Sequence, residues 1–101
     1  MDLKVSADGT LQIGKTQWRC ALGRSGIRTL KREGDGVTPA GCYALRRVLY
    51  RSDRMPPPDT RLALAPIGPQ DGWCDAPDDT AYNRPVELPY PASTESLWRD
   101  D

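Results

Sequence analysis

The chain has 101 residues, enough for one domain with one hydrophobic core and too few for two ordinary domains. Its 14 basic and 14 acidic residues cancel, so the composition lacks the basic excess typical of proteins that bind nucleic acids. No stretch approaches the ~20 apolar residues of a membrane span, and the first residues lack the apolar run of a signal peptide. The sequence therefore predicts one domain over residues 1–101, with no nucleic-acid partner and no membrane span, and leaves the compartment unknown.

The cysteines do not form a recognisable framework. Cys20, Cys42 and Cys74 are odd in number and far apart, and the chain contains no histidine. An odd count argues against full disulfide pairing, and the absence of CxxC spacing argues against a zinc site. We expect each cysteine to be a small buried hydrophobe. The sequence predicts no metal and no cofactor.

Residues 2–22 alternate in the manner of β-strands and contain two turn signals. Asp8-Gly9 is a favoured hairpin dipeptide, and Gly14-Lys15 marks a second reversal. The segment 17–22 then continues as a strand. The chain is thus predicted to open with a β-meander.

The next segment is predicted to be mostly loop, because residues 23–41 are rich in glycine. Thr38-Pro39-Ala40-Gly41 fits a type I turn, in which proline suits the second position and glycine the fourth. Residues 42–50 then predict a strand. Its apolar residues change phase, so we expect a bulge or an end near Arg46-Arg47.

Three consecutive prolines, Pro56 to Pro58, exclude a helix or a central strand because they remove successive backbone donors. Residues 61–67 predict a short strand. Residues 68–91 predict a long loop rich in proline and aspartate. Loops of this length within a compact domain are usually functional or poorly ordered.

The last predicted element is a short C-terminal helix that begins near Ser93. Ser93 is a suitable N-cap, and Glu95 suits the positive end of a helix dipole. The sequence ends about one turn later without a helix terminator, so we expect an incomplete domain. The predicted fold class is mainly β, a meander or mixed sheet with long Pro/Gly loops and this short helix.

The sharpest motif is Gly34-Asp35-Gly36-Val37-Thr38-Pro39-Ala40-Gly41, followed by Cys42 and Tyr43. It lacks the spacing of a phosphate-binding loop. It resembles the signature of the L,D-transpeptidase family, also called the YkuD family, in which this stretch leads into a strand of the catalytic sheet. The resemblance implies the N-terminal portion of a YkuD-like catalytic domain and gives this loop a role in the fold, not in the chemistry.

A second stretch is similar to one branch of that family: Gly72-Trp73-Cys74-Asp75-Ala76-Pro77, Ala81-Tyr82-Asn83-Arg84-Pro85-Val86 and Leu97-Trp98-Arg99-Asp100. The aromatic, amide and guanidinium groups of four residues suit a peptide or carboxylate-bearing substrate. These predicted substrate-binding residues are Trp73, Tyr82, Asn83 and Arg84. The alternative is that the two aromatic residues anchor a long loop while the arginine is solvated.

The resemblance implies a cysteine acyltransferase that acts on peptidoglycan stem peptides in the bacterial cell envelope. A cysteine attacks the donor peptide, a histidine acts as base, and an amine of a second stem peptide or water resolves the thioester. The family's histidine and Gly-Cys element lie downstream of these motifs. Gly41-Cys42 belongs instead to the signature at residues 34–43, which we call the front motif, and Cys74 has no cationic neighbour in sequence. We therefore assign no catalytic residue and expect the 101 residues to be inactive.

Two other functions remain open from the sequence. One is a non-catalytic β-module that binds a peptide, a glycan or a partner protein, and the other is a structural domain completed by a second chain. An incomplete fold would expose strand edges, so we also expect self-association. The acidic set Asp75, Asp78 and Asp79 could suggest calcium, but its spacing does not fit an EF-hand.

Overall fold

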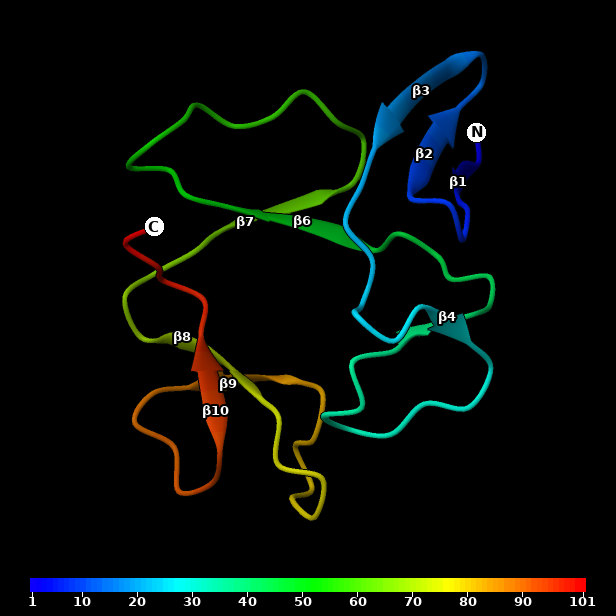
Figure 1. Cartoon of the computed structure of the whole chain (residues 1–101). Coiled ribbons are helices and arrows are strands. Elements are labelled where there is room, and N and C mark those ends of the chain that lie inside the picture. The colour runs from blue at the N-terminus through cyan, green and yellow to red at the C-terminus, as the bar shows by residue number, and fades with distance from the viewer. The chain divides into compact units, whose positions relative to one another are not determined.

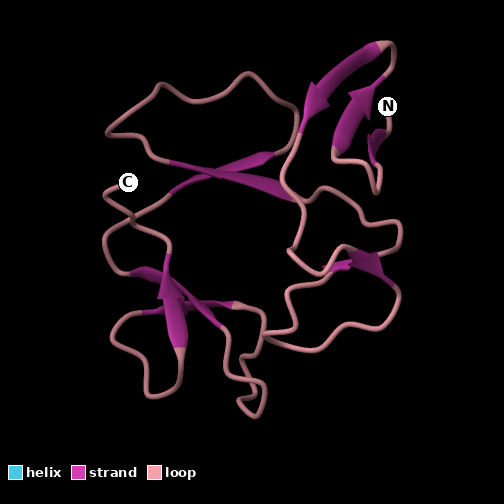
Figure 2. Cartoon of the chain, viewed as in Figure 1, coloured by secondary structure: helices cyan, strands magenta, loops and turns pink.

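The computed structural model describes residues 1–101, and all of its regular elements are β-strands (Figures 1 and 2). The chain divides into two compact units, Met1–Tyr43 and Ala44–Asp101. The prediction of a mainly β fold is confirmed. No helix long and apolar enough to cross a membrane is present.

The first unit begins with an antiparallel meander of β1 (Leu3–Val5), β2 (Thr10–Ile13) and β3 (Thr16–Arg19). Glycines with positive φ stand in both reversals, at 82° for Gly9 and 57° for Gly14. These are backbone conformations that a residue without a Cβ adopts without strain. The predicted meander is therefore confirmed, and its turns lie where the sequence placed them.

The glycine-rich part of the first unit contains a short parallel pair, β4 (Ile27–Arg28) and β5 (Thr38–Pro39). The predicted type I turn at 38–41 is wrong, because its first two residues belong to β5. Pairing with β4 holds them extended: the Thr38 N–H donates to the Gly26 carbonyl, and the Ala40 N–H to that of Arg28. Most of the remaining segment is loop, as predicted.

The second unit begins with β6 (Arg47–Tyr50) and β7 (Ala63–Pro66), which pair in parallel. A parallel pair needs a crossover of about a dozen residues, and the proline-rich connection 51–62 supplies it. The predicted strand at 61–67 is confirmed. The predicted strand at 42–50 is correct only from Arg47 onward, so the change of phase near Arg46 marks the start of the strand.

A three-stranded antiparallel sheet completes the second unit, in the order β10-β8-β9. Its strands are β8 (Asp71–Cys74), β9 (Pro85–Glu87) and β10 (Thr94–Ser96). The predicted uninterrupted loop over 68–91 is wrong, because it contains two of these strands. The predicted helix near Ser93 is also wrong, because pairing with β8 stabilises an extended backbone and overrides the local helix signal.

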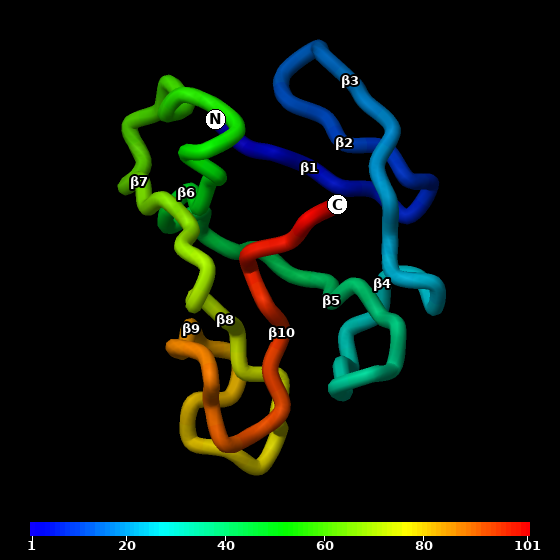
Figure 3. Tube along the Cα trace, turned by 90° about the vertical axis from the view of Figure 1, so that its left-hand side faces the viewer, coloured from blue at the N-terminus to red at the C-terminus, as the bar shows by residue number.

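The two faces of β8 differ in burial. Gly72 and Cys74 are buried, whereas Asp71 is exposed and Trp73 half-buried. A Cβ at Gly72 would lie 2.6 Å from Cδ2 of Leu88, so only glycine leaves room for that side chain. Figure 3 shows β8, β9 and β10 running together, with loops 75–84 and 88–93 joining them. One face of β8 is therefore covered and the other is open.

The C-terminal segment of the second unit is held by two arginines that follow β6. The Arg51 guanidinium lies 3.6 Å from the ring centroid of Trp98 and donates to the Arg99 carbonyl. Arg54 donates to the carbonyl of Asp100 at 3.1 Å. Stacking and hydrogen bonding thus join two segments that are far apart in sequence. This contact gives the Leu97-Trp98-Arg99-Asp100 motif a structural role.

Candidate functional site

The predicted substrate-binding residues gather where β8 meets the loop that leads to β9. Trp73 lies on the open face of β8, and its Nε1–H donates to Oδ1 of Asn83 at 3.0 Å. The indole is half-buried, and the amide that fixes it is exposed. The hydrogen bond holds the ring in one orientation while part of its surface stays accessible to a ligand.

The backbone at Asn83 explains why an asparagine stands there. Its φ is 59°, a left-handed conformation that asparagine tolerates better than most side chains. Its N–H donates to the Cys74 carbonyl at 2.8 Å, and the Cys74 N–H donates to the Arg84 carbonyl at 3.0 Å. The end of the β8–β9 ladder thus fixes both the main chain and the side chain of Asn83.

Tyr82 and Arg84 flank Asn83 and differ in environment. Tyr82 is half-buried, and its N–H donates to the Asp79 carbonyl at 3.0 Å. Arg84 is exposed, and its guanidinium makes no ion pair or hydrogen bond. The structure therefore joins a fixed indole to a fixed amide, and the uncommitted cation is the next residue along the chain from that amide. Their role in substrate binding remains a prediction.

Asp79 organises this loop, although no sequence motif marks it as a structural residue. Its Oδ1 accepts hydrogen bonds from the Tyr90 hydroxyl at 2.6 Å and from the Ala81 N–H at 2.8 Å. The Tyr90 hydroxyl contributes most to keeping the pKa of the Asp79 carboxyl below its usual value, followed by the Ala81 N–H, while desolvation opposes them and the Cys74 thiol adds a smaller lowering. The hydrogen bond to Asp79 is also the main reason that the pKa of the Tyr90 hydroxyl is raised to about 12.

Of the two hydrogen bonds to Asp79, only the one from the Ala81 N–H has a signal in the sequence. An aspartate that accepts the N–H two residues later forms an Asx-turn. The Asp79–Ala81 bond has that form, as do Asp8–Thr10 and Asp35–Val37. The bond from Tyr90 has no such local signal.

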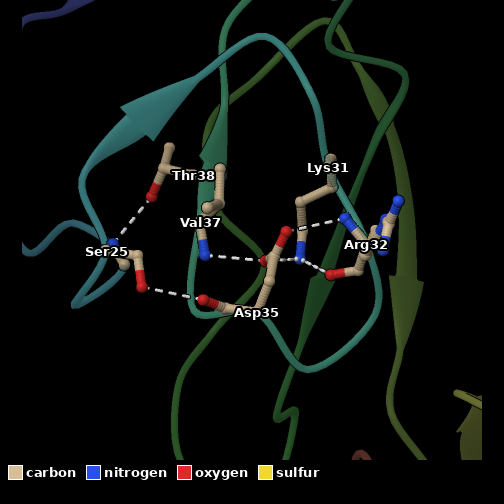
Figure 4. A network of polar contacts seen from close by, with 7 residues as sticks. Ser25, Lys31, Arg32, Asp35, Val37 and Thr38 are labelled. Atoms are coloured by element: carbon tan, nitrogen blue, oxygen red, sulfur yellow. Dashed lines mark hydrogen bonds and ion pairs between the residues drawn. The ribbon is translucent and has the colours of Figure 1, made fainter.

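The Gly34–Gly41 motif belongs to the first unit and forms a separate polar network (Figure 4). The Asp35 carboxylate accepts from Lys31 Nζ and the Arg32 N–H, each at 2.6 Å, and from the Val37 N–H at 2.8 Å. These bonds, led by that from Lys31, lower the pKa of Asp35 to about 2. All three of these donors belong to residues 31–37, so Asp35 holds the backbone of its own loop in place.

The three cysteines lie in different surroundings. Cys74 is fully buried, Cys20 is half-buried and Cys42 is exposed. The expectation of burial is therefore correct for Cys74 and wrong for Cys42, which lies outside any strand. Because the Cys74 thiol faces the interior, it cannot meet a substrate at the surface.

Comparison with known proteins gives one match. The model of the YkuD family, the L,D-transpeptidase catalytic domain, matches residues 5–99. No curated protein and no solved structure matches the chain. The matched range includes both the Asp35 loop and the Trp73–Arg84 region.

Proposed function

Because the chain belongs to the L,D-transpeptidase catalytic-domain (YkuD) family, we propose that the surface of Trp73, Tyr82, Asn83 and Arg84 binds a peptidoglycan stem peptide. The observation that carries this proposal is the Trp73–Asn83 hydrogen bond at 3.0 Å, together with the unpaired Arg84 that follows Asn83 in the chain. A fixed aromatic face offers apolar contact at little entropic cost, and a free guanidinium offers two parallel bonds to a carboxylate. Stem peptides carry both apolar and carboxylate groups.

We propose further that both units belong to one L,D-transpeptidase-like domain, since the matched range spans 95 of the 101 residues, from 5 to 99. In this domain, residues 1–101 bind substrate and do not themselves perform the acyl transfer. The family reaction uses a histidine and a Gly-Cys element outside the motifs found here. Burial of Cys74 and the position of Cys42 in the front motif support this division.

The binding proposal is tested by titrating a stem peptide into ¹⁵N-labelled chain and following the indole N–H signals. The chain has three tryptophans, and Trp73→Phe assigns the relevant signal. We expect the Trp73 signal to shift on binding. Arg84→Gln should weaken binding about tenfold, the scale of one lost charge-assisted hydrogen bond.

Arg61→Gln is the matched control, because Arg61 is also exposed and without a partner in the second unit. It should leave the affinity unchanged. Equal losses for the two variants would show general electrostatic attraction and contradict the assignment. No shift at Trp73 with any stem peptide would overturn the proposed function.

The division of labour is tested by mass spectrometry after incubation with a stem peptide and an amine acceptor. We expect neither a thioester adduct nor a cross-linked product. An adduct on this chain that disappears in Cys42→Ser would show that the exposed thiol reacts, and would refute the proposed inactivity.

A further inference from the structure

The β8–β9 pair carries the candidate site at the end where Trp73 lies. A groove lies at its other end, where Asp71 pairs with Glu87. Its volume is about 680 Å³, within the usual range for ligand sites. It is lined by the segments 68–71 and 85–87. Proline, glycine and valine supply much of the wall, and the acidic side chains of Asp71 and Glu87 supply its charge.

The two carboxylates face each other across the strand pair. Asp71 and Glu87 are directly opposite in the antiparallel register, so their side chains leave the same face of the sheet. Like charges in this position destabilise a sheet. Neither carboxylate is neutralised, because neither forms an ion pair. The arrangement therefore places two negative charges on one groove without a compensating cation.

The two carboxylates differ in how far they are already satisfied. Oδ2 of Asp71 accepts the Gly68 N–H at 2.7 Å, which fixes this side chain at the groove. Glu87 accepts no hydrogen bond and is exposed. One carboxylate is thus held in place by the backbone, and the other is free to bind a donor that enters the groove.

The aromatic ring of the candidate site belongs to the same face. Trp73 is directly opposite Pro85, two residues along from the Asp71–Glu87 pair, or about 7 Å at the usual rise of a strand. An indole ring attracts cations through its negative face, as carboxylates do through their charge. A cation held by the two carboxylates of the groove therefore lies on the same face of the sheet as an aromatic residue farther along β8.

We propose that this groove docks a peptide through a primary ammonium group, held by Glu87 and Asp71, with the apolar part of the peptide lying along Pro85, which shares their face of the sheet. Charge complementarity identifies the occupant: a cation is attracted by both carboxylates, an anion is repelled by them, and a neutral donor gains a hydrogen bond without the attraction between charges. The inference rests on the proposed function in one respect: if the peptide is a stem peptide, the group bound here is a free amine, whereas Arg84 binds a carboxylate.

The proposal is tested with N-acetyl-lysine methylamide as an ammonium probe and its Nε-acetylated form as the neutral counterpart. Backbone amide shifts of the ¹⁵N-labelled 101-residue chain report where each probe binds. We expect the charged probe to shift amides at 68–71 and 85–87, and the neutral probe to leave them unchanged. High salt should reduce the shifts, because exposed charges are screened.

Glu87→Gln separates binding from folding. We expect about fivefold weaker binding of the charged probe, the scale of one exposed ion pair, together with an unchanged or raised melting temperature. Asp59→Asn removes the same charge from an exposed residue outside the groove and should leave the affinity unchanged. Equal shifts with both probes, or equal affinities of Glu87→Gln and the unsubstituted chain, would overturn the proposal. So would groove shifts produced by Ca²⁺ and not by the ammonium probe.

The same titrations distinguish this inference from the proposed function. A stem peptide that shifts Trp73 equally well with its amine acetylated would overturn the groove assignment and leave the proposed function standing. If the ammonium probe shifted the groove amides and no stem peptide bound, the groove assignment would stand and the proposed function would be overturned.

Discussion

Two aspartates organise two loops of this chain, and they do so over different distances along the sequence. The donors to the Asp35 carboxylate are all within four residues. The strongest donor to Asp79 is Tyr90, 11 residues away, and that hydroxyl belongs to the segment after β9. The first loop is therefore shaped locally, whereas the second depends on the sheet that brings its partners together.

The difference shows why a conspicuous motif need not be the functional site. The Asp35 loop uses its polar groups on its own backbone, and little is left for a ligand. The Asp79 loop directs its half-buried acceptor to its own donors, Tyr90 and Ala81, and leaves Arg84 free at the surface. A loop supported from within can hold uncommitted groups in fixed positions, which is what binding requires.

The substitution with the largest expected effect on stability is Gly23→Ala, which disturbs the loop organised by Asp35. A Cβ at Gly23 would lie 2.2 Å from the Gly36 carbonyl oxygen and 2.9 Å from the Thr38 nitrogen. Both are backbone atoms that cannot turn aside, so we expect a loss of about 3 kcal/mol in the free energy of unfolding. Urea unfolding measures it.

Gly68→Ala is the control for this substitution, because its Cβ would meet only Oδ2 of Asp71, at an ordinary 3.6 Å. It should leave unfolding nearly unchanged. Equal effects of the two substitutions would show that the close approach of Gly23 to the Asp35 loop does not hold in solution.

A smaller and more local effect is expected from Asp79→Asn. The carboxylate loses its charge, so its bonds to the Tyr90 hydroxyl and the Ala81 N–H weaken. Hydrogen exchange of the Asn83 amide should accelerate, and stem-peptide binding should weaken. The matched variant Asp35→Asn should accelerate exchange at Val37 and leave peptide binding unaltered.

If Asp35→Asn weakened peptide binding as much as Asp79→Asn, the two loops would not be independent in function. If only Asp79→Asn acted, the second loop alone would support the site.

The sequence was sufficient where the determining contacts are local. The meander follows from alternation and from two turns whose glycines adopt positive φ, and the segment before Thr38 is mostly loop, as predicted. The turn predicted at 38–41 was wrong because β4 pairs with its first two residues. The helix expected near Ser93 was wrong because β8 lies beside that segment, and no local pattern reports a partner some 20 residues away. For the same reason the strands within 68–91 were missed.

The candidate site was predictable only in part. The chemistry of Trp73 and Asn83 predicts a binding role for both, and the structure joins them by a hydrogen bond. The Tyr90–Asp79 bond and the Asp71–Glu87 pair depend on register, which three short strands do not specify from sequence alone.

The pH dependence of stability should separate the two networks. Folding lowers the pKa of Asp35 from 3.8 to about 2, so its stabilising contribution is present above pH 3.8 and is lost as the pH falls towards 2. Folding raises the pKa of Tyr90 from 10.0 to about 12, so that contribution is present below pH 10 and is lost as the pH rises towards 12. Urea midpoints measured across both ranges test the two signs.

Variants assign each change to its residue. A plot of the urea midpoint against pH should fall at its acid end and at its alkaline end. Asp35→Asn should flatten the fall at the acid end (the acid limb), and Tyr90→Phe the fall at the alkaline end (the alkaline limb). Asp79 also has a lowered pKa, so part of the acid limb should persist in Asp35→Asn. An alkaline limb unchanged by Tyr90→Phe would contradict the Tyr90–Asp79 bond.

The smallest expected effect concerns the ion pair at the edge of the Asp35 loop. Lys31 Nζ lies 2.6 Å from Oδ1 of Asp35, and the lysine side chain is 36% exposed. Lys31→Met keeps much of the apolar stem and removes the charge, while the Arg32 and Val37 N–H groups still hold the carboxylate. We therefore expect an unfolding midpoint close to that of the unsubstituted chain. A loss as large as that from Asp35→Asn would mean that the lysine, and not the two backbone N–H groups, holds the loop closed.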